Sequence, residues 1–347
     1  MKAAVLHEYD ESLSRDQFVR YEDVPDLKIE RPNDVIVRIG GAGVCRTDLH
    51  IIEGIWRSKV DVTLPYVMGH ENAGWVEAVG KGVESVRVGD PVICHPLVTS
   101  GHCLASRRGD DMHTEDSKFP GINTNGGYAD YLLSGERSLI KLPTSLAPKD
   151  VAPYTDAGLT AYRAAKKASR HLLPGQYAVA IGVGGLGHIG IQVLTALCAA
   201  EIIAVDRSDM ALQLAKECGA HHFVRADGNE LQRVLELTGG KGAEAVIDFV
   251  GEGDAVRTGI AMTRNAGCYY IVGYGGKIDL PTIDMITSEK TIVGNLVGTY
   301  PELVELMALA DRGLVNLSTR EYRLQDANQA LRDLHHGQIK GRAVLIP

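Results

Sequence analysis

The sequence has no excess of positive charge. Its 36 Lys and Arg residues stand against 44 Asp and Glu residues, and the formal net charge is -8. Such a chain is not attracted to phosphate backbones or to anionic lipid, so the charge balance argues against nucleic-acid and membrane-surface partners. The expected partner is a small molecule.

Cysteine is also sparse, with 6 residues scattered over 347. Secreted disulfide scaffolds are short and cysteine-rich, so this pattern predicts free thiols and a cytoplasmic location. The apolar run before His7 is too short for a signal peptide. We therefore expect a protein that is not exported.

One uncharged stretch, residues 177–200, has the length of a membrane helix. Its glycines, together with His188 and Gln192, argue against a span. A short strand, a glycine turn and a buried helix would give the same apolar composition. We predict that combination and no membrane segment.

The chain is long for one hydrophobic core, so we expect two domains. Before residue 150, short alternating runs such as Asp34–Ile39 are broken by Gly, Pro and Asp, which is typical of β-rich structure. After Tyr177, apolar strands alternate with amphipathic stretches, and this pattern predicts a parallel, doubly wound six-stranded sheet. The expected strands are Tyr177–Ile181, Ile202–Val205, His222–Val224, Ala245–Phe249, Cys268–Val272 and Thr291–Val293.

Local start and stop signals support this division. Ser208 is a candidate N-cap, and Gly219 follows that helix where a C-terminal glycine belongs. Pro301 suits the first turn of a helix that Gly313 ends. The last fifty residues are therefore expected to form two helices and a closing strand, Arg342–Ile346.

A glycine turn follows the first apolar strand of the predicted sheet. It has the G-x-G-x-x-G pattern and consists of Gly182, Val183, Gly184, Gly185, Leu186 and Gly187. Such a turn lets the backbone and a helix N-terminus approach a pyrophosphate, although glycine turns can also serve packing alone. The next strand ends in Asp206, whose carboxylate suits the ribose hydroxyls of NAD and repels the phosphate of NADP. Its neighbour Arg207 could instead accept that phosphate.

Two motifs in the first half of the chain carry candidate metal ligands. They are Gly43-Val-Cys45-Arg46-Thr47-Asp48-Leu49-His50 and Gly69-His70-Glu71, which continues through Gly74 and Gly80 to Val83. A third stretch contains Asp156. Cysteine, histidine and aspartate offer the S, N and O donors that zinc accepts. Taken singly, each has a plain alternative: a core cysteine, a satisfied histidine or a helix-capping acid.

With these motifs the whole chain resembles the zinc-dependent medium-chain alcohol dehydrogenase family, whose G-H-E-x2-G-x5-G-x2-V signature is matched at every fixed position from Gly69 to Val83. The resemblance implies a GroES-like β-rich catalytic domain over residues 1–157 and 297–347. It implies an NAD-binding Rossmann domain over residues 158–296. The implied activity is reversible hydride transfer between a primary or secondary alcohol and NAD.

The resemblance also implies one catalytic zinc held by Cys45, His70 and Asp156, with aspartate where most relatives carry a second cysteine. Glu71 would orient or replace a ligand, and Asp48 would accept a ring proton from His70. Either acid could also be a surface charge. The lobe that holds a structural zinc in relatives retains Cys103 alone of four cysteines, so no structural zinc is expected; a site improvised with His102 and His113 is the rival.

Further roles follow from the same resemblance. Thr47, the cofactor ribose and His50 would relay the proton to solvent, and the substrate pocket would be mainly apolar. The residues implied in cofactor contact, beyond the glycine turn and Asp206, are Arg46, Thr160, Val272, Leu296, Val297 and Arg342. The residues implied in the substrate pocket are Trp56, Leu97, Ile122 and Asn123. Relatives of this length imply a homotetramer.

Two other hypotheses stay open at the level of sequence. The first is a dinucleotide-binding redox sensor or structural protein without turnover, which would be expected to lose the ligand set. The second is a metal-free reductase of the same superfamily, whose members lack the constellation of Cys45, His70 and Asp156. The retained ligands favour the zinc enzyme.

Overall fold

The computed structural model describes residues 1–60 and 62–347, which divide into two compact units. Unit 1 comprises Met1–Ala157, Thr299–Asp311 and Leu317–Pro347. Unit 2 comprises Gly158–Gly298 and Arg312–Asn316. The chain therefore returns to unit 1 at residue 299, and the short segment 312–316 belongs to unit 2.

Unit 2 is built on a six-stranded sheet with the order β11-β10-β9-β12-β13-β14, in which every neighbouring pair is parallel. This confirms the predicted doubly wound sheet. The strands are β9 (Tyr177–Ile181), β10 (Glu201–Asp206), β11 (His222–Arg225), β12 (Ala243–Asp248), β13 (Thr263–Ile271) and β14 (Thr291–Gly294).

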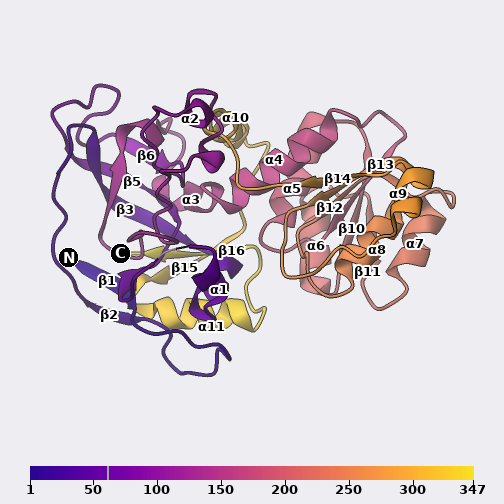
Figure 1. The fold of residues 1–347 in the computed structure, drawn as a ribbon, viewed down its shortest axis with the longest axis horizontal. Helices are drawn as coiled ribbons and strands as arrows, with labels where there is room; N and C mark the ends of the chain where they lie inside the picture. Colours follow the sequence, from indigo (N-terminus) through magenta and orange to yellow (C-terminus); the bar gives the residue numbers. More distant parts are fainter. Residues whose placement is uncertain (61) are drawn as a thin grey trace. The chain divides into compact units, whose positions relative to one another are not determined.

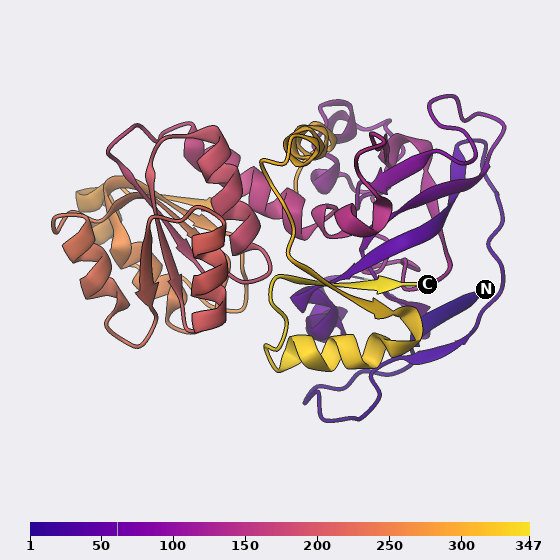
Figure 2. The same cartoon turned by 180° about the vertical axis from the view of Figure 1, so that it is seen from behind.

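Helices lie on both faces of this sheet, as the opposite views in Figures 1 and 2 show. Ser208 caps α6 as predicted, because its hydroxyl accepts a hydrogen bond from the N–H of Ala211. Among the described residues, no helix is long and apolar enough to cross a membrane, and residues 177–200 contain β9 and α5. The helices are α4 (Ala157–Ser169), which begins at the end of unit 1, α5 (Gly187–Leu197), α6 (Asp209–Glu217), α7 (Glu230–Leu237), α8 (Ala255–Met262) and α9 (Thr282–Ser288).

The core of unit 2 comes from the middle of its strands. Val179, Ile203 and Val246 are fully buried on neighbouring strands. Burial of one such side chain stabilises the fold by about 1.5–3 kcal/mol. The packed strands thus give a rigid support for the loops at their carboxyl ends.

Unit 1 contains a three-stranded sheet, β2-β1-β4, and a seven-stranded sheet ordered β15-β16-β3-β5-β6-β8, with β7 paired to β3. The β-rich prediction is confirmed, and the strand expected at Asp34–Ile39 extends to Val44. The strands are β1 (Lys2–Leu6), β2 (Arg20–Asp23), β3 (Asp34–Val44), β4 (Tyr66–Val67), β5 (Glu71–Val79), β6 (Pro91–Cys94), β7 (Tyr131–Gly135), β8 (Leu139–Lys141), β15 (Thr319–Arg323) and β16 (Arg342–Ile346).

The C-terminal segment completes unit 1. Strand β16 pairs antiparallel with β3, so the yellow end of the chain lies beside the indigo start in Figure 1. The two expected helices and the closing strand are present, whereas β15 was not predicted from the sequence. The helices of unit 1 are α1 (Arg46–Ile52), α2 (Leu104–Arg107), α3 (Pro148–Val151), α10 (Tyr300–Asp311) and α11 (Ala327–His335), with 3₁₀ turns at Ile55–Ser58, Asp111–His113, Glu136–Ser138, Ala152–Tyr154 and Leu324–Asp326.

Candidate metal centre and nucleotide turn

Four metal-ligating side chains meet inside unit 1. Ligand atoms of Cys45, His70, Glu71 and Asp156 all lie within 4.8 Å of one another. Cys45 follows β3, His70 and Glu71 stand at the start of β5, and Asp156 directly precedes α4. The β3–β5 pairing and the turn before α4 therefore bring three distant stretches to one point.

The ring of His70 is fully buried between two carboxylates. Its Nδ1 lies 3.2 Å from Oδ1 of Asp48, and its Nε2 lies 3.4 Å from Oδ2 of Asp156. Among the residues that the structure describes, both carboxylates face the ring, but neither ring nitrogen has a hydrogen bond of good geometry. Buried imidazoles normally satisfy both nitrogens, so Nε2, facing a thiol and a carboxylate, suits a metal ion.

Asp48 fixes the geometry on the other side of the ring. Its Oδ2 accepts hydrogen bonds from the N–H of Cys45 at 2.8 Å and from the hydroxyl of Tyr128 at 2.7 Å. Its Oδ1 is left to face His70. One carboxylate therefore positions two of the candidate ligands, and Tyr128, which sequence reasoning missed, holds that carboxylate in place.

The electrostatic surroundings favour positive charge at His70. Burial alone lowers the pKa of His70, but the carboxylates of Asp48 and Asp156 outweigh it and raise that pKa well above its ordinary value. Burial raises the pKa of Glu71, and the guanidinium of Arg342 opposes the shift. The negative groups that stabilise a protonated imidazole would also stabilise a divalent cation.

Glu71 is held by a buried ion pair with Arg342 of β16. Its other oxygen, Oε1, accepts the N–H of Ala157 at 2.9 Å. At Gly43 a Cβ atom would lie 2.0 Å from Oε2 of Glu71, so the close approach requires glycine there. Arg342, which the resemblance implies in cofactor contact, pairs with Glu71 in this structure.

The donor set has the chemistry of a zinc site. A thiolate and a carboxylate balance the charge of Zn²⁺, and the imidazole adds the neutral nitrogen ligand. Three protein ligands leave a fourth position for a small molecule, as a catalytic site requires. Cys45, His70 and Asp156 thus fit a catalytic zinc, with Glu71 within reach of the same point.

The glycine turn of unit 2 joins β9 to α5. Gly182 has φ +81°, and a Cβ at Gly187 would lie 2.2 Å from the carbonyl oxygen of Gly182. At Gly184, by contrast, a Cβ would meet nothing within 4 Å. The outer glycines are thus required by the turn itself, whereas Gly184 faces open space that a ligand could use.

Asp206 at the end of β10 is fixed against this turn. Its Oδ2 accepts the N–H of Val183 and its Oδ1 accepts the N–H of Ser208, both at 2.8 Å. A cavity of about 550 Å³ opens beside Gly182 and Asp206, at the carboxyl ends of the parallel strands. Nucleotides bind in this region of doubly wound sheets.

Comparisons with known proteins relate this chain to alcohol dehydrogenases over its whole length. Residues 31–144 match the model of the alcohol dehydrogenase GroES-like domain, and residues 185–312 match that of zinc-binding dehydrogenases. An NAD-dependent alcohol dehydrogenase of Sulfolobus acidocaldarius is 34% identical and covers 99% of both chains. The crystal structure of an alcohol dehydrogenase from Aeropyrum pernix has a TM-score of 0.96 and 46% identity over 100% of both chains.

This chain belongs to the zinc-dependent medium-chain alcohol dehydrogenase family. Cofactor use differs among its relatives, since a D-arabinose 1-dehydrogenase (NADP(+)) of Saccharolobus solfataricus is 33% identical over 100% of this chain and 97% of its own.

The relay candidates of this dehydrogenase share one helix. Thr47 and His50 are three residues apart on α1, a spacing that places them on one helix face. Thr47 is half-buried and His50 is buried, whereas Arg46 is exposed. The remaining cofactor candidates lie in unit 2: Thr160 and Val297 are buried, Val272 and the turn residues Gly185 and Leu186 are half-buried, and Leu296 and Arg207 are exposed.

The predicted substrate residues fall into two groups. Leu97 and Ile122 are buried and Trp56 is half-buried, with Trp56 and Ile122 packed in one apolar cluster of unit 1. Asn123 is half-buried and anchors its own loop, because its Oδ1 accepts the N–H of Phe119 at 2.6 Å. Phe119, which was not predicted from the sequence, meets the ring of His70 edge-on at 6.0 Å between centroids.

Cys103 makes local contacts. Its sulfur accepts the N–H of Ser106 at 3.4 Å and the hydroxyl of Thr114 at 3.7 Å. His102 and His113 are exposed. Within residues 1–60 and 62–347, one group of metal-ligating side chains lies close enough together to share an ion, and it is the group around Cys45.

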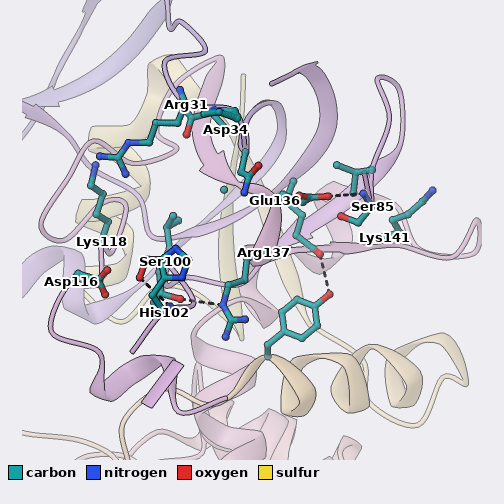
Figure 3. Close-up of a pocket in the computed structure, with 18 residues that line it drawn as sticks. Arg31, Asp34, Ser85, Ser100, His102, Asp116, Lys118, Glu136, Arg137 and Lys141 are labelled. Atoms are coloured by element: carbon teal, nitrogen blue, oxygen red, sulfur yellow. Dashed lines mark hydrogen bonds between the residues drawn. The ribbon is translucent and has the colours of Figure 1, made fainter. Parts of the chain in front are cut away.

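A larger cavity of unit 1, about 790 Å³, contains none of the ligand group around Cys45 (Figure 3). Glu136 on its wall accepts the N–H groups of Glu84 and Ser85. Arg137 pairs with Asp111. These lining charges already have partners, so we place the candidate site at the buried ligand group and not in this larger space.

Proposed function

We propose that this chain catalyses reversible hydride transfer between a primary or secondary alcohol and NAD, giving an aldehyde or ketone. The observation that carries the proposal is the convergence of Cys45, His70 and Asp156 around the unsatisfied Nε2 of a buried imidazole. The relatives, most of which are alcohol dehydrogenases, support it.

One catalytic zinc per chain would be held by Cys45, His70 and Asp156. When bound there, zinc polarises the oxygen of an alcohol or carbonyl and stabilises negative charge on it. Asp48 keeps the Nδ1 proton of His70 in place, so that Nε2 is presented as a donor atom. Arg342 neutralises Glu71, which keeps that carboxylate in reach without adding a net charge to the site.

Thr47 and His50 move the proton in this proposal. The hydroxyl of Thr47 accepts the proton that the alcohol loses and gives up its own, which the imidazole of His50 takes and passes on toward solvent. Their positions on one face of α1, directly after Cys45, support this order. The imidazole is suited to the task because its ordinary pKa lies near neutrality.

NAD would bind on the glycine turn of unit 2, with Asp206 accepting from the ribose hydroxyls. Both oxygens of Asp206 already accept backbone N–H groups, which fixes the carboxylate and leaves further lone pairs for a ribose. The proposal includes no structural zinc, since the sulfur of Cys103 accepts hydrogen bonds from the neighbouring Ser106 and Thr114.

The substrate is expected to be a medium-sized aliphatic or aromatic alcohol, because Phe119, Leu97 and Ile122 are apolar.

We also propose that the protein is a homotetramer and is located in the cytoplasm. The six free thiols suit a reducing compartment. Strand β14 lies at one edge of the sheet of unit 2. Three exposed apolar side chains precede it in the chain and could contact another subunit; they are Ile278, Ile283 and Ile286.

The test follows the absorbance of reduced cofactor with NAD and a panel of alcohols, before and after chelation and zinc return. Turnover should vanish on chelation and recover with zinc. The Asp156→Ala variant should lose turnover, whereas Asp150→Ala, on the neighbouring α3, should retain it. Nucleotide binding without any turnover would favour the sensor hypothesis, and turnover that resists chelation would favour the metal-free enzyme.

A further inference from the structure

The cavity beside Asp206 gathers side chains from three successive strand ends. Asp206 and Arg207 follow β10, Glu230 begins α7 after β11, and Glu252 and Asp254 follow β12. Four of these five charged residues are acids. The space in which the adenosine half of a dinucleotide would lie is therefore strongly negative.

Cations near the cavity are already neutralised. Arg225 pairs with Asp209, and Arg233 pairs with Asp227 at 2.9 Å. In the described part of the chain, Arg207 is the one cationic side chain among the lining residues, and it forms no ion pair. A single exposed arginine faces several carboxylates.

The acids are not equivalent. Asp254 is exposed and pairs with Arg257 at 3.0 Å, which reduces its effect on a ligand. Glu252 also takes part in an interaction with another residue. Glu230 is half-buried, and its Oε2 accepts the N–H of Gly228 at 2.7 Å, a contact that fixes the carboxylate without cancelling its charge.

We propose that Glu230 is a second cofactor-discriminating residue, which acts with Asp206 to exclude a 2′-phosphate from the ribose and so selects NAD over NADP. The inference rests on the proposed binding of a dinucleotide at the glycine turn. Glu230 acts by charge, since a phosphate near −2 is repelled by a fixed carboxylate across the same cavity. Arg207 alone does not compensate for two such carboxylates.

The charge argument gives an expected size. Repulsion between a doubly charged phosphate and one carboxylate several ångströms away in water corresponds to roughly five- to tenfold in affinity at low ionic strength. Salt near 0.15 M, with a Debye length of about 8 Å, should reduce the effect. Loss of the charge on Glu230 should not change the binding of an uncharged part of the nucleotide, such as the adenine ring.

The test uses calorimetric titration of the whole protein with 5′-AMP and with adenosine 2′,5′-bisphosphate. Glu230→Gln keeps the shape and the acceptor for Gly228. It should tighten the bisphosphate roughly five- to tenfold at low salt and leave 5′-AMP unchanged. Adding Arg207→Gln to that variant should remove the gain. The control is Glu236→Gln on the same helix, where the carboxylate accepts from Gln232 away from the cavity.

Equal effects of Glu230→Gln on the two nucleotides, or no effect on the bisphosphate, would overturn the role of Glu230 while leaving dinucleotide binding intact. A wild-type protein that binds neither nucleotide would overturn this inference and the proposed function together. Retained 5′-AMP binding in each variant shows that the fold is preserved.

Discussion

The buried ion pair between Arg342 and Glu71 should be essential to unit 1. Glu71 is fully buried and Arg342 is 3% exposed, so neither charge has water to replace its partner. In Arg342→Met the stem of the side chain is kept and its charge is lost. Glu71 would then be an uncompensated carboxylate against the candidate metal ligands.

Removing one member of a buried ion pair costs about 3–5 kcal/mol. For a unit of this size, 1 kcal/mol corresponds to roughly 2–4 °C in melting temperature, so the expected loss is on the order of 10 °C. Glu71→Gln should cost a similar amount, because the guanidinium is then unpaired. In the double variant both charges are gone, and the glutamine carbonyl still accepts the N–H of Ala157.

The assay is thermal unfolding of the wild type, the two single variants and the double variant. The double variant should recover more than half of the larger single loss, since replacing both members of a buried pair is often nearly neutral. Losses that simply add, or an Arg342→Met variant that melts with the wild type, would refute the argument that the two charges stabilise each other.

Three further predictions concern other contacts of unit 1. Asp48→Asn should weaken zinc binding about 10- to 100-fold in competition with a chromophoric chelator, because the amide no longer favours the Nδ1 proton of His70; unchanged affinity would contradict this. Phe119→Ala should raise kcat/KM for bulky aromatic secondary alcohols relative to ethanol by about tenfold, and a fall would argue against a wall at Phe119. Burial raises the pKa of Asp10, but hydrogen bonds from the N–H groups of Arg15 and Ser12 outweigh it, and the net pKa lies below the ordinary 3.8. Asp10→Asn should therefore destabilise the protein by about 1 kcal/mol at neutral pH, and the difference should disappear as the pH falls below 3.8 and through the folded-state pKa; a difference that persists at low pH would count against this.

Local signals in the sequence predicted most of unit 2. Strand, glycine turn and helix follow one another within a few residues, and the cap at Ser208 needs no distant partner. The strand β13 begins at Thr263, five residues before the predicted Cys268. Its first residues are largely polar, so an apolar pattern could not reveal them. The missed strand β15 has the same cause, because four of its five residues are exposed.

The candidate ligands were recognised from motifs, but the residues that hold them were not. Tyr128 reaches Asp48 from 80 residues away, and Arg342 reaches Glu71 from 271 residues away. Neither contact leaves a periodicity or a spacing to detect. The contact between the side chain of Asn123 and the backbone of Phe119 was not predicted either. Such partners are visible only once the sheet brings β3, β5 and β16 together.

The most direct test of the metal centre is zinc X-ray absorption combined with elemental analysis of the purified protein. We expect one zinc per chain, with a single sulfur neighbour at about 2.3 Å and the remaining ligands nitrogen or oxygen. The sulfur signal should disappear in Cys45→Ser and persist in Cys94→Ser, which alters a buried thiol outside the ligand group. Zinc without a sulfur neighbour, or a sulfur signal that survives Cys45→Ser, would contradict the assignment of Cys45, His70 and Asp156 as its ligands.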